Sequence, residues 1–334
     1  MAEIGDRRGV LWREAFGAFT FPDGPLADRP AREDTVFDLA SLTKPLATTS
    51  VAMLLVSERR LTLEDLVAAR LGEWRGGDRD GVTIGDLLEH ASGLAARLVD
   101  RPPQGRREFQ HDICTMPLEY PPRSKSVYSD LGFILLGFIV EDADGRAFDA
   151  QFAELQMRVL GRIGPTFHPS DDRSRIAPTR PLDEDLRRGQ LLAGEVHDAY
   201  AAALGGVAGH AGLFGTAADV GDLARLALRG AGGDDAVPEP FAPRTLARTI
   251  TKTTVPGSSR ALGWDTMLPT SSCGSGMSPA AFGHVGFTGT SLWIDPILDR
   301  YFVLLTNRVC GGGTLAEMRQ LRRSFHDIAV QIAR

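Results

Sequence analysis

A serine and a lysine three residues apart are the first side chains of this sequence whose types and spacing suggest chemistry. Ser41 and Lys44 lie in the segment FDLASLTKP, residues 37–45. Pro45 is tolerated only near the start of a helix, because it lacks an N–H and its ring would strike the preceding turn. We therefore expect a helix to begin near Ser41. Both side chains then lie on one helix face, within mutual reach.

The chemistry expected of this pair is nucleophilic attack by the serine. Residues 46–56 are apolar on nearly every side, as in a buried helix, and burial disfavours the ammonium form of a lysine. A neutral Lys44 could take the Ser41 proton, and the N–H groups of the first helical turn would favour negative charge beside it. S-x-x-K strings also arise by chance. The chain has lysine only at Lys44, Lys125 and Lys252, and only Lys44 follows a serine at this spacing.

A second polar group, Tyr128-Ser129-Asp130, stands directly before the apolar segment 131–137. A loop that ends in polar residues before a helix can present them to a cleft, and a phenolic oxygen near a lysine can transfer protons. The alternative is structural: Tyr128 packs in the core and Asp130 caps the helix. The sequence alone leaves both interpretations open.

The third group is the glycine-rich segment GHVGFTGTS, residues 283–291, placed at the start of a predicted strand. Gly283, Gly286 and Gly289 suggest that something approaches the backbone closely, such as an acyl group bound along the strand. An N–H of this segment could complete an oxyanion hole with that of Ser41. A β-bulge or tight internal packing is the alternative.

Together these three groups resemble the motifs of the serine β-lactamases, the penicillin-binding DD-peptidases and related esterases. Ser41 and Lys44 match S-x-x-K, YSD at 128–130 resembles Y-x-N, and HVG at 284–286 resembles the H-x-G variant. Two further segments, LLEHASGL at 87–94 and GGVAGHAGLF at 205–214, also resemble family stretches. The resemblance covers nearly the whole chain.

This resemblance implies a role for each matching residue. Ser41 is the nucleophile that becomes acylated, Lys44 is its proton partner, and Tyr128 protonates the leaving atom. The N–H groups of Ser41 and Phe287 form the oxyanion hole. The substrate-binding residues implied in the same way are Asp130, His284, Gly286 and His210.

The resemblance also implies an α/β (α+β) fold, in which an antiparallel sheet flanked by helices is joined to an all-helical lobe and the active site lies between them. Residues 1–30 and 250–334 are expected to form the sheet-containing lobe, and residues 31–249 the mainly helical lobe. Apolar periodicity predicts helices over 42–60, 83–90, 131–142, 148–160 and 217–229.

Local patterns in the C-terminal region agree with this fold. Residues 286–294 and 301–306 are rich in β-branched and aromatic side chains and flank a turn, which predicts an antiparallel hairpin. Thr314 and Glu317 form a capping box before a final amphipathic helix. Residues 10–19 could add one or two strands, with an uncovered edge that favours a homodimer.

Two departures from the family pattern bear on the substrate. His284 stands where a lysine would offer a permanent cation, and Asp130 replaces an amide with a carboxylate that would repel a substrate carboxylate. We therefore expect an esterase-like hydrolase rather than an efficient β-lactamase. The alternatives are a D-amino-acid peptidase of the DD-carboxypeptidase type, a weak β-lactamase, and a non-catalytic sensor that retains the pocket.

Composition narrows the classes of molecule that the protein is expected to bind. A net charge of −6 without long runs of one sign favours a small-molecule ester, amide or peptide substrate over nucleic acid or a membrane surface. Three scattered cysteines and seven histidines match no metal-ligand spacing, so neither metal nor cofactor is expected. No apolar stretch resembles a signal peptide or a membrane span, which predicts a cytoplasmic protein for the sequence as given.

Overall fold

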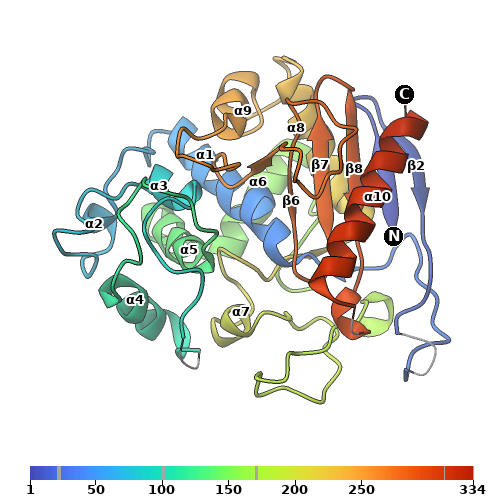
Figure 1. Cartoon of the computed structure of the whole chain (residues 1–334), viewed down its shortest axis with the longest axis horizontal. Coiled ribbons are helices and arrows are strands. Elements are labelled where there is room, and N and C mark those ends of the chain that lie inside the picture. The colour runs from blue at the N-terminus through green and yellow to red at the C-terminus, as the bar shows by residue number, and fades with distance from the viewer. Residues whose placement is uncertain (21–23, 100–101, 170–171, 312, 334) are drawn as a thin grey trace.

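A six-stranded antiparallel sheet forms one side of the molecule (Figure 1). The computed structural model describes residues 1–20, 24–99, 102–169, 172–311 and 313–333. The strands lie in the order β2-β1-β8-β7-β6-β5, so that the first strand of the chain pairs with the last strand and with β2. Their bounds are Ala2–Gly5 for β1, Val10–Glu14 for β2, Asp265–Thr266 for β5, Phe282–Val285 for β6, Ser291–Asp295 for β7 and Arg300–Leu304 for β8. The predicted antiparallel sheet flanked by helices is confirmed.

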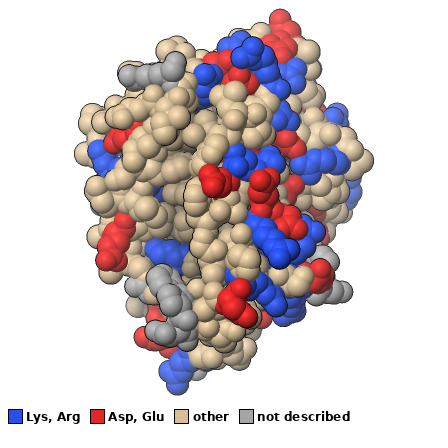
Figure 2. All heavy atoms as spheres, turned by 90° about the vertical axis from the view of Figure 1, so that its right-hand side faces the viewer, with Lys and Arg blue, Asp and Glu red and all other residues tan. Residues whose placement is uncertain are grey.

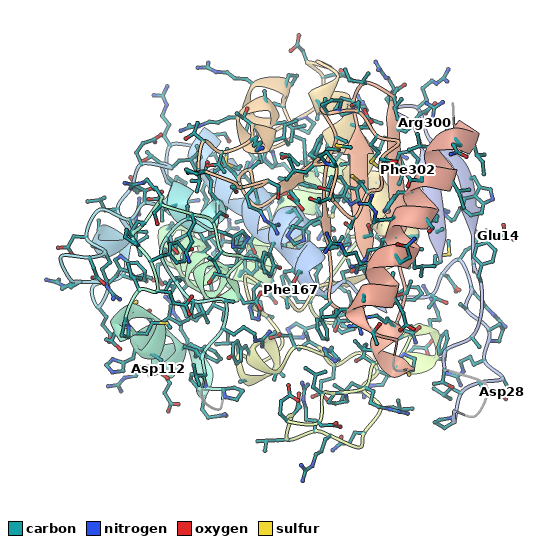
Figure 3. All side chains as sticks on the ribbon, in the orientation of Figure 1. Glu14, Asp28, Asp112, Phe167, Arg300 and Phe302 are labelled. Carbon is teal, nitrogen blue, oxygen red and sulfur yellow. The ribbon has the colours of Figure 1, made fainter. Side chains whose placement is uncertain are left out.

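Helix α10, Leu315–Ala333, packs across the outer face of this sheet. Thr314 and Glu317 form the predicted capping box: each backbone N–H donates to the other's side chain, at 2.8 Å and 3.1 Å. Phe302 of β8, labelled in Figure 3, is buried together with Ala329 and Val330 of the helix. The apolar face of α10 thus covers the sheet.

Helix α8, Ala217–Ala231, packs on the other face of the sheet, against β1, β7 and β8. It is followed by α9, Pro243–Ile250, which lies against it. The predicted helix over 217–229 is therefore present, and it contacts the sheet although its residues fall within the range 31–249. The division of the chain into two lobes stays a prediction.

The remaining helices gather on the far side of α8 (Figure 1). Four were predicted from apolar periodicity: α1 Ser50–Ser57, α3 Ile84–Leu88, α5 Asp130–Asp144 and α6 Phe148–Leu160. Three short or polar helices were not: α2 Val67–Arg70, α4 Gly105–Thr115 and α7 Ala199–Ala203. Helix α5 is buried along most of its length and contacts α1, α3, α4 and α6, so it forms the centre of this part.

Strand β2 is one of the two edge strands of the sheet and carries the partly exposed apolar residues Val10, Leu11 and Trp12. The homodimer through an uncovered edge stays a prediction, which sedimentation of the purified protein can test. On the face drawn in Figure 2, acidic and basic side chains lie next to one another. Within the described residues, no helix combines the length and apolar character needed to cross a bilayer.

Candidate active site

The backbone before Ser41 is held in a tight, strained turn. The two-residue strand β3, Phe37–Asp38, pairs with β4, Phe214–Gly215, and Ala40 then adopts a left-handed φ of 48°. The Ala40 N–H donates to the buried side chain of Asp38 at 2.8 Å, which stabilises this conformation. This strained residue is the first of a short 3₁₀ turn, Ala40–Leu42.

Helical structure begins at Ala40, near Ser41 as the position of Pro45 predicts, but its first turns are not α-helical. After the 3₁₀ turn, a π-helical segment, Lys44–Thr49, carries Pro45 in its first turn and leads into α1. Single-turn π segments occur often at functional sites. Periodicity in the sequence shows the apolar character of this helix but not its winding.

Lys44 makes three hydrogen bonds although its side chain is fully buried. Its Nζ donates to Ser41 Oγ at 3.1 Å, to Asp130 Oδ1 at 2.8 Å and to the carbonyl oxygen of His210 at 3.0 Å. An ammonium group has three N–H donors, so each donor has an acceptor. The lysine predicted as the partner of Ser41 is therefore held at hydrogen-bonding distance from it.

The prediction that burial makes Lys44 neutral is wrong. Burial by itself would lower the pKa of the Lys44 amine, but the carboxylate of Asp130 and the phenol of Tyr128 outweigh it, and the pKa is raised. Lys44 is thus an ammonium that donates to Ser41 Oγ and has no lone pair for its proton. The sequence contained both partners, but not the pairing between residues 86 positions apart.

Asp130 belongs to a closed ring of charged and polar groups. Its second carboxylate oxygen accepts from Arg97 at 3.0 Å, and the same guanidinium nitrogen donates to Asp198 at 3.1 Å. The other carboxylate oxygen of Asp198 lies 2.7 Å from His210 Nε2, and the His210 carbonyl accepts from Lys44. Burial would raise the pKa of Asp198, but His210 and Arg97 together lower it.

Tyr128 lies between two cations and two imidazoles. Lys44 Nζ is 4.8 Å from the centre of its ring, and the Arg260 guanidinium carbon is 4.9 Å from the same point. The ring centres of His90 and His284 are 4.7 Å and 5.8 Å away. The structure therefore brings the predicted residues Ser41, Lys44, Tyr128 and His284 into one site, with Arg260 added to them.

Both imidazoles beside Tyr128 are neutral. Burial, then the positive charges of Arg260 and Lys44, lower the pKa of His90 and of His284 well below the usual value. His284 Nδ1 lies 2.9 Å from the carbonyl of Val285, while its Nε2 is buried without a partner among the described residues. His284 can thus offer a neutral hydrogen-bonding group, as its place in the sequence predicts.

The third motif lies at a different point in the fold from the one predicted. His284 and Val285 end β6, and residues 286–290 form the turn into β7 rather than the start of a strand. A Cβ on Gly286 would lie 2.7 Å from the Leu39 carbonyl and 2.2 Å from Thr290 Oγ1. Protein atoms of the turn before Ser41 thus make the close approach to Gly286.

Phe287 follows Gly286 on this turn, and its side chain stacks on the His197 ring with the ring centres 5.5 Å apart. Thr288 and Thr290 attach the turn to the nucleophile segment, because their hydroxyls donate to the carbonyls of Asp38 and Leu39 at 2.8 Å and 3.0 Å. The two backbone segments predicted to form an oxyanion hole are therefore held against each other.

Sequence reasoning missed Arg97, Asp198, Arg260 and Asp38. Asp38 stands three residues before Ser41 in the first motif, and an acidic residue between Phe37 and Leu39 was the signal that the sequence offered. In the structure its carboxylate is buried and is the acceptor that the backbone there needs. The other three lie in loops or at the start of a short helix and match no motif. In the described part of the chain, no cluster of three or more His, Cys, Asp or Glu side chains could hold a metal ion.

The fold and the Ser–Lys–Tyr arrangement define a class, the serine hydrolases that work through an acyl-enzyme. A family model described as Beta-lactamase matches residues 6–326, and the chain belongs to this family. A protein of Escherichia coli K12 with the provisional name D-alanyl-D-alanine carboxypeptidase is 34% identical over 334 residues, covering 90% of this chain and 76% of the relative. The protein is thus a serine hydrolase of the β-lactamase family.

Solved structures share the fold over nearly the whole chain. EstCE1, a hydrolase with promiscuous acyltransferase activity, has a TM-score of 0.75 at 22% identity, covering 98% of this chain and 92% of its own. A β-lactamase/D-alanine carboxypeptidase from Yersinia pestis has a TM-score of 0.73 at 18% identity, covering 100% and 92%. At these identities the likeness concerns the fold alone.

Proposed function

We propose that the protein hydrolyses carboxylic esters through an acyl-Ser41 intermediate. Ser41 Oγ attacks the carbonyl carbon, the alcohol leaves, and water then releases the acid and restores the serine. The observation that carries this proposal is the 3.1 Å hydrogen bond from Lys44 to Ser41 Oγ, because the other two donors of Lys44 are fixed by Asp130 and His210. That geometry orients the hydroxyl and leaves its proton free for a base.

Tyr128 is the base in this proposal, and Lys44 is the cation that supports it. The phenolate form of Tyr128 takes the Ser41 proton as the C–O bond forms and, now a phenol, gives it to the oxygen of the leaving alcohol. Lys44 and Arg260 lie beside the Tyr128 ring, so two positive charges stabilise the negative charge that the phenolate carries before it takes the proton and again after it gives the proton away. Lys44 remains an ammonium throughout, which differs from the proton-accepting role expected from sequence.

The oxyanion of the tetrahedral intermediate binds the N–H groups of Ser41 and Phe287. Among the described residues, neither group donates to a backbone carbonyl. Removing one such donor typically costs about 10²–10³ in rate. In this proposal His284 and His210 bind the substrate, and Gly286 allows the turn to lie close to the segment before Ser41.

Asp130 acts on the substrate through Lys44 in this proposal. Both of its carboxylate oxygens accept from cations, Lys44 and Arg97, so its negative charge is compensated. The repulsion of a substrate carboxylate expected from the sequence is weakened accordingly. The compensated charge of Asp130 is therefore compatible with a substrate that carries a carboxylate.

Arg260 favours a second function, a peptidase that acts on D-amino-acid peptides with a free carboxyl terminus. Its guanidinium lies over the Tyr128 ring, and none of the ion pairs between described residues includes it. It could supply the cation that His284 lacks, since guanidinium binds carboxylate in a bidentate manner. The relative from Escherichia coli carries a name of this kind.

The two functions separate in one kinetic comparison. We would measure kcat/KM on a neutral p-nitrophenyl ester and on a D-alanyl-D-alanine peptide, for the unsubstituted protein, Arg260→Gln and Arg248→Gln. Arg248 pairs with Glu64 at the surface and serves as the control. A loss for Arg260→Gln that is much larger on the peptide than on the ester supports the peptidase. Ester turnover that falls in Arg260→Gln but not in Arg248→Gln, with no peptide turnover by any form, supports the esterase.

A further inference from the structure

Two arginines on the outer side of the sheet bind carbonyl groups of the turn that carries Phe287. Arg322 of α10 donates through one nitrogen to the Gly286 carbonyl at 2.6 Å and to the Thr290 carbonyl at 2.9 Å. Arg308, before α10, donates to the Phe287 carbonyl at 2.6 Å and 3.3 Å. Both cations therefore act on residues 286–290.

Arg322 is unusual because it is a buried cation without an acidic partner. Its exposure is 7%, and no carboxylate lies within ion-pair distance of it among the described residues. Burial, with the nearby charge of Arg308, lowers the pKa of Arg322 to about 10. Its Nε is buried and unpaired. A buried charge without an acidic partner lowers the stability of the folded protein. We therefore expect the carbonyl contacts of Arg322 to serve a function.

The Gly286 carbonyl and the Phe287 N–H belong to the same planar peptide group. In a trans peptide the C=O and N–H bonds point in opposite directions. A guanidinium that holds the Gly286 oxygen toward α10 therefore directs the Phe287 N–H away from α10. On the other side of the turn, Thr290 Oγ1 donates to the Leu39 carbonyl, two residues before Ser41.

A cation at a carbonyl oxygen also polarises the peptide. Hydrogen bonds in a chain strengthen one another, so a peptide that accepts from a guanidinium is a better donor at its N–H. Arg308 reinforces this arrangement from the next peptide, where it binds the Phe287 carbonyl, and its guanidinium lies 4.8 Å from the Phe287 ring centre.

We propose that Arg322, assisted by Arg308, is a positioning residue for the oxyanion hole, which fixes and polarises the peptide that supplies the Phe287 N–H. The inference rests on the proposed function, because it requires that this N–H binds the oxyanion. Arg322 does not touch the substrate and acts from behind the sheet. Its loss should therefore weaken transition-state binding more than substrate binding.

Arg323 provides a matched control on the same helix. Its guanidinium also donates to backbone carbonyls, those of Pro269 and Ser271, but these lie on the loop between β5 and β6. Arg322→Met and Arg323→Met each remove two arginine–carbonyl contacts between α10 and a segment that connects two strands of the sheet. A merely structural role would affect the melting temperature and turnover of both variants alike.

The test measures kcat, KM, melting temperature and inhibition by an arylboronic acid, which forms a tetrahedral adduct with the serine. For Arg322→Met we expect kcat to fall about tenfold or more, KM to stay within about twofold, and boronate affinity to fall in parallel with kcat. Arg323→Met should keep kcat within about twofold. Arg322→Lys should recover part of the loss, because an ammonium can still bind the Gly286 carbonyl.

Equal kcat values for Arg322→Met and Arg323→Met, with the unsubstituted protein active, would overturn this inference and leave the proposed function intact. No ester or peptide turnover and no boronate binding by the unsubstituted protein would overturn both. If Arg322→Met does not fold, Arg308→Met tests the same claim, because the less buried Arg308 binds the next carbonyl along the turn. A loss of kcat without a rise in KM is again the supporting result.

Discussion

Asp130 accepts a hydrogen bond from the buried ammonium of Lys44 at 2.8 Å and thereby sets the charge of the lysine beside Ser41. The carboxylate stands at the position where the Y-x-N pattern has an amide. Because the carboxylate keeps Lys44 protonated, proton transfer from Ser41 passes to Tyr128 in the proposed mechanism. Substitutions at Asp130, Asp38 and Gly286 test different parts of this site.

The first prediction concerns the Lys44–Asp130 pair. Asp130→Asn keeps the shape of the side chain but removes the negative charge that raises the pKa of Lys44, so the effect of burial should then dominate and lower that pKa. We expect a loss of roughly 1.5–3 kcal/mol in the free energy of unfolding at pH 7. Urea denaturation of both proteins measures this difference.

The same variant has a characteristic pH dependence. In the unsubstituted protein the folded pKa of Lys44 lies above 10.5, so the stability it contributes is full below that value and is lost only as pH rises through the folded pKa. In the Asp130→Asn variant the folded pKa of Lys44 should lie below 10.5. The stability of this variant should then rise as pH increases toward 10.5. The difference between the two proteins should narrow from about pH 7 to about pH 10. A difference that widens would contradict the charge assigned to Lys44.

The second prediction concerns Asp38, whose carboxylate accepts from the N–H groups of Ala40 at 2.8 Å and His197 at 2.7 Å. Burial raises its pKa to about 6. Protonation removes an acceptor from the turn that carries Ser41, so the acylation rate should fall as pH drops through about 6. Asp38→Asn should lose this limb of the pH–rate profile and should be slower at neutral pH.

The stability that Asp38 contributes changes with pH in the opposite direction to that of an ordinary salt-bridged carboxylate. Its folded pKa of about 6 is above the usual 3.8, so its contribution is full below 3.8 and is lost as pH rises through 6. The unsubstituted protein should therefore gain stability relative to Asp38→Asn as pH falls from about 6 to about 4. Thermal melts of both proteins across this range measure the change. A loss of stability of the unsubstituted protein relative to Asp38→Asn, as pH falls, would contradict the raised pKa of the buried Asp38 carboxyl.

The third prediction concerns Gly286→Ala. The added methyl group would lie 2.7 Å from the Leu39 carbonyl and 3.1 Å from Ala40 Cβ, so it would push the Phe287 turn away from Ser41. We expect a loss of about 1–3 kcal/mol in stability, together with a fall in kcat of about tenfold or more.

Gly132→Ala on α5 is the control for this substitution. Its added methyl group meets the nearest atom, on Leu87, at 3.6 Å, which is ordinary contact. Alanine is also the better helix former, so stability should be equal or higher and kcat unchanged. Equal kcat for both glycine variants would mean that the close approach of the two segments has no part in catalysis.

Much of the fold and of the central site could be predicted from sequence. Helix α5 has an apolar run too long for a strand, and the strands β7 and β8 flank a clear turn, so periodicity was sufficient for both. Ser41, Lys44 and Tyr128 stand in short local motifs. The structure places all three together because α5 and the segment after Ser41 pack against each other.

The remainder depended on contacts that local patterns do not encode. Strand β6 was missed because FGHV is short and ends in the glycine-rich turn, and α4 because its polar surface hides three buried positions, Phe109, Ile113 and Cys114. The charge of Lys44 depended on Asp130 and Tyr128, which lie far along the chain. Arg260 and Arg322 belong to no sequence motif, and their roles follow only from the residues that they contact in the structure.

The most direct test of the central claim is the intact mass of the protein after incubation with a fluorophosphonate, which traps activated serines, compared with Ser41→Ala. We expect one phosphonyl adduct per chain on the unsubstituted protein and none on Ser41→Ala, with both proteins folded. An adduct of equal yield on Ser41→Ala, or no adduct on either protein, would contradict Ser41 as the nucleophile.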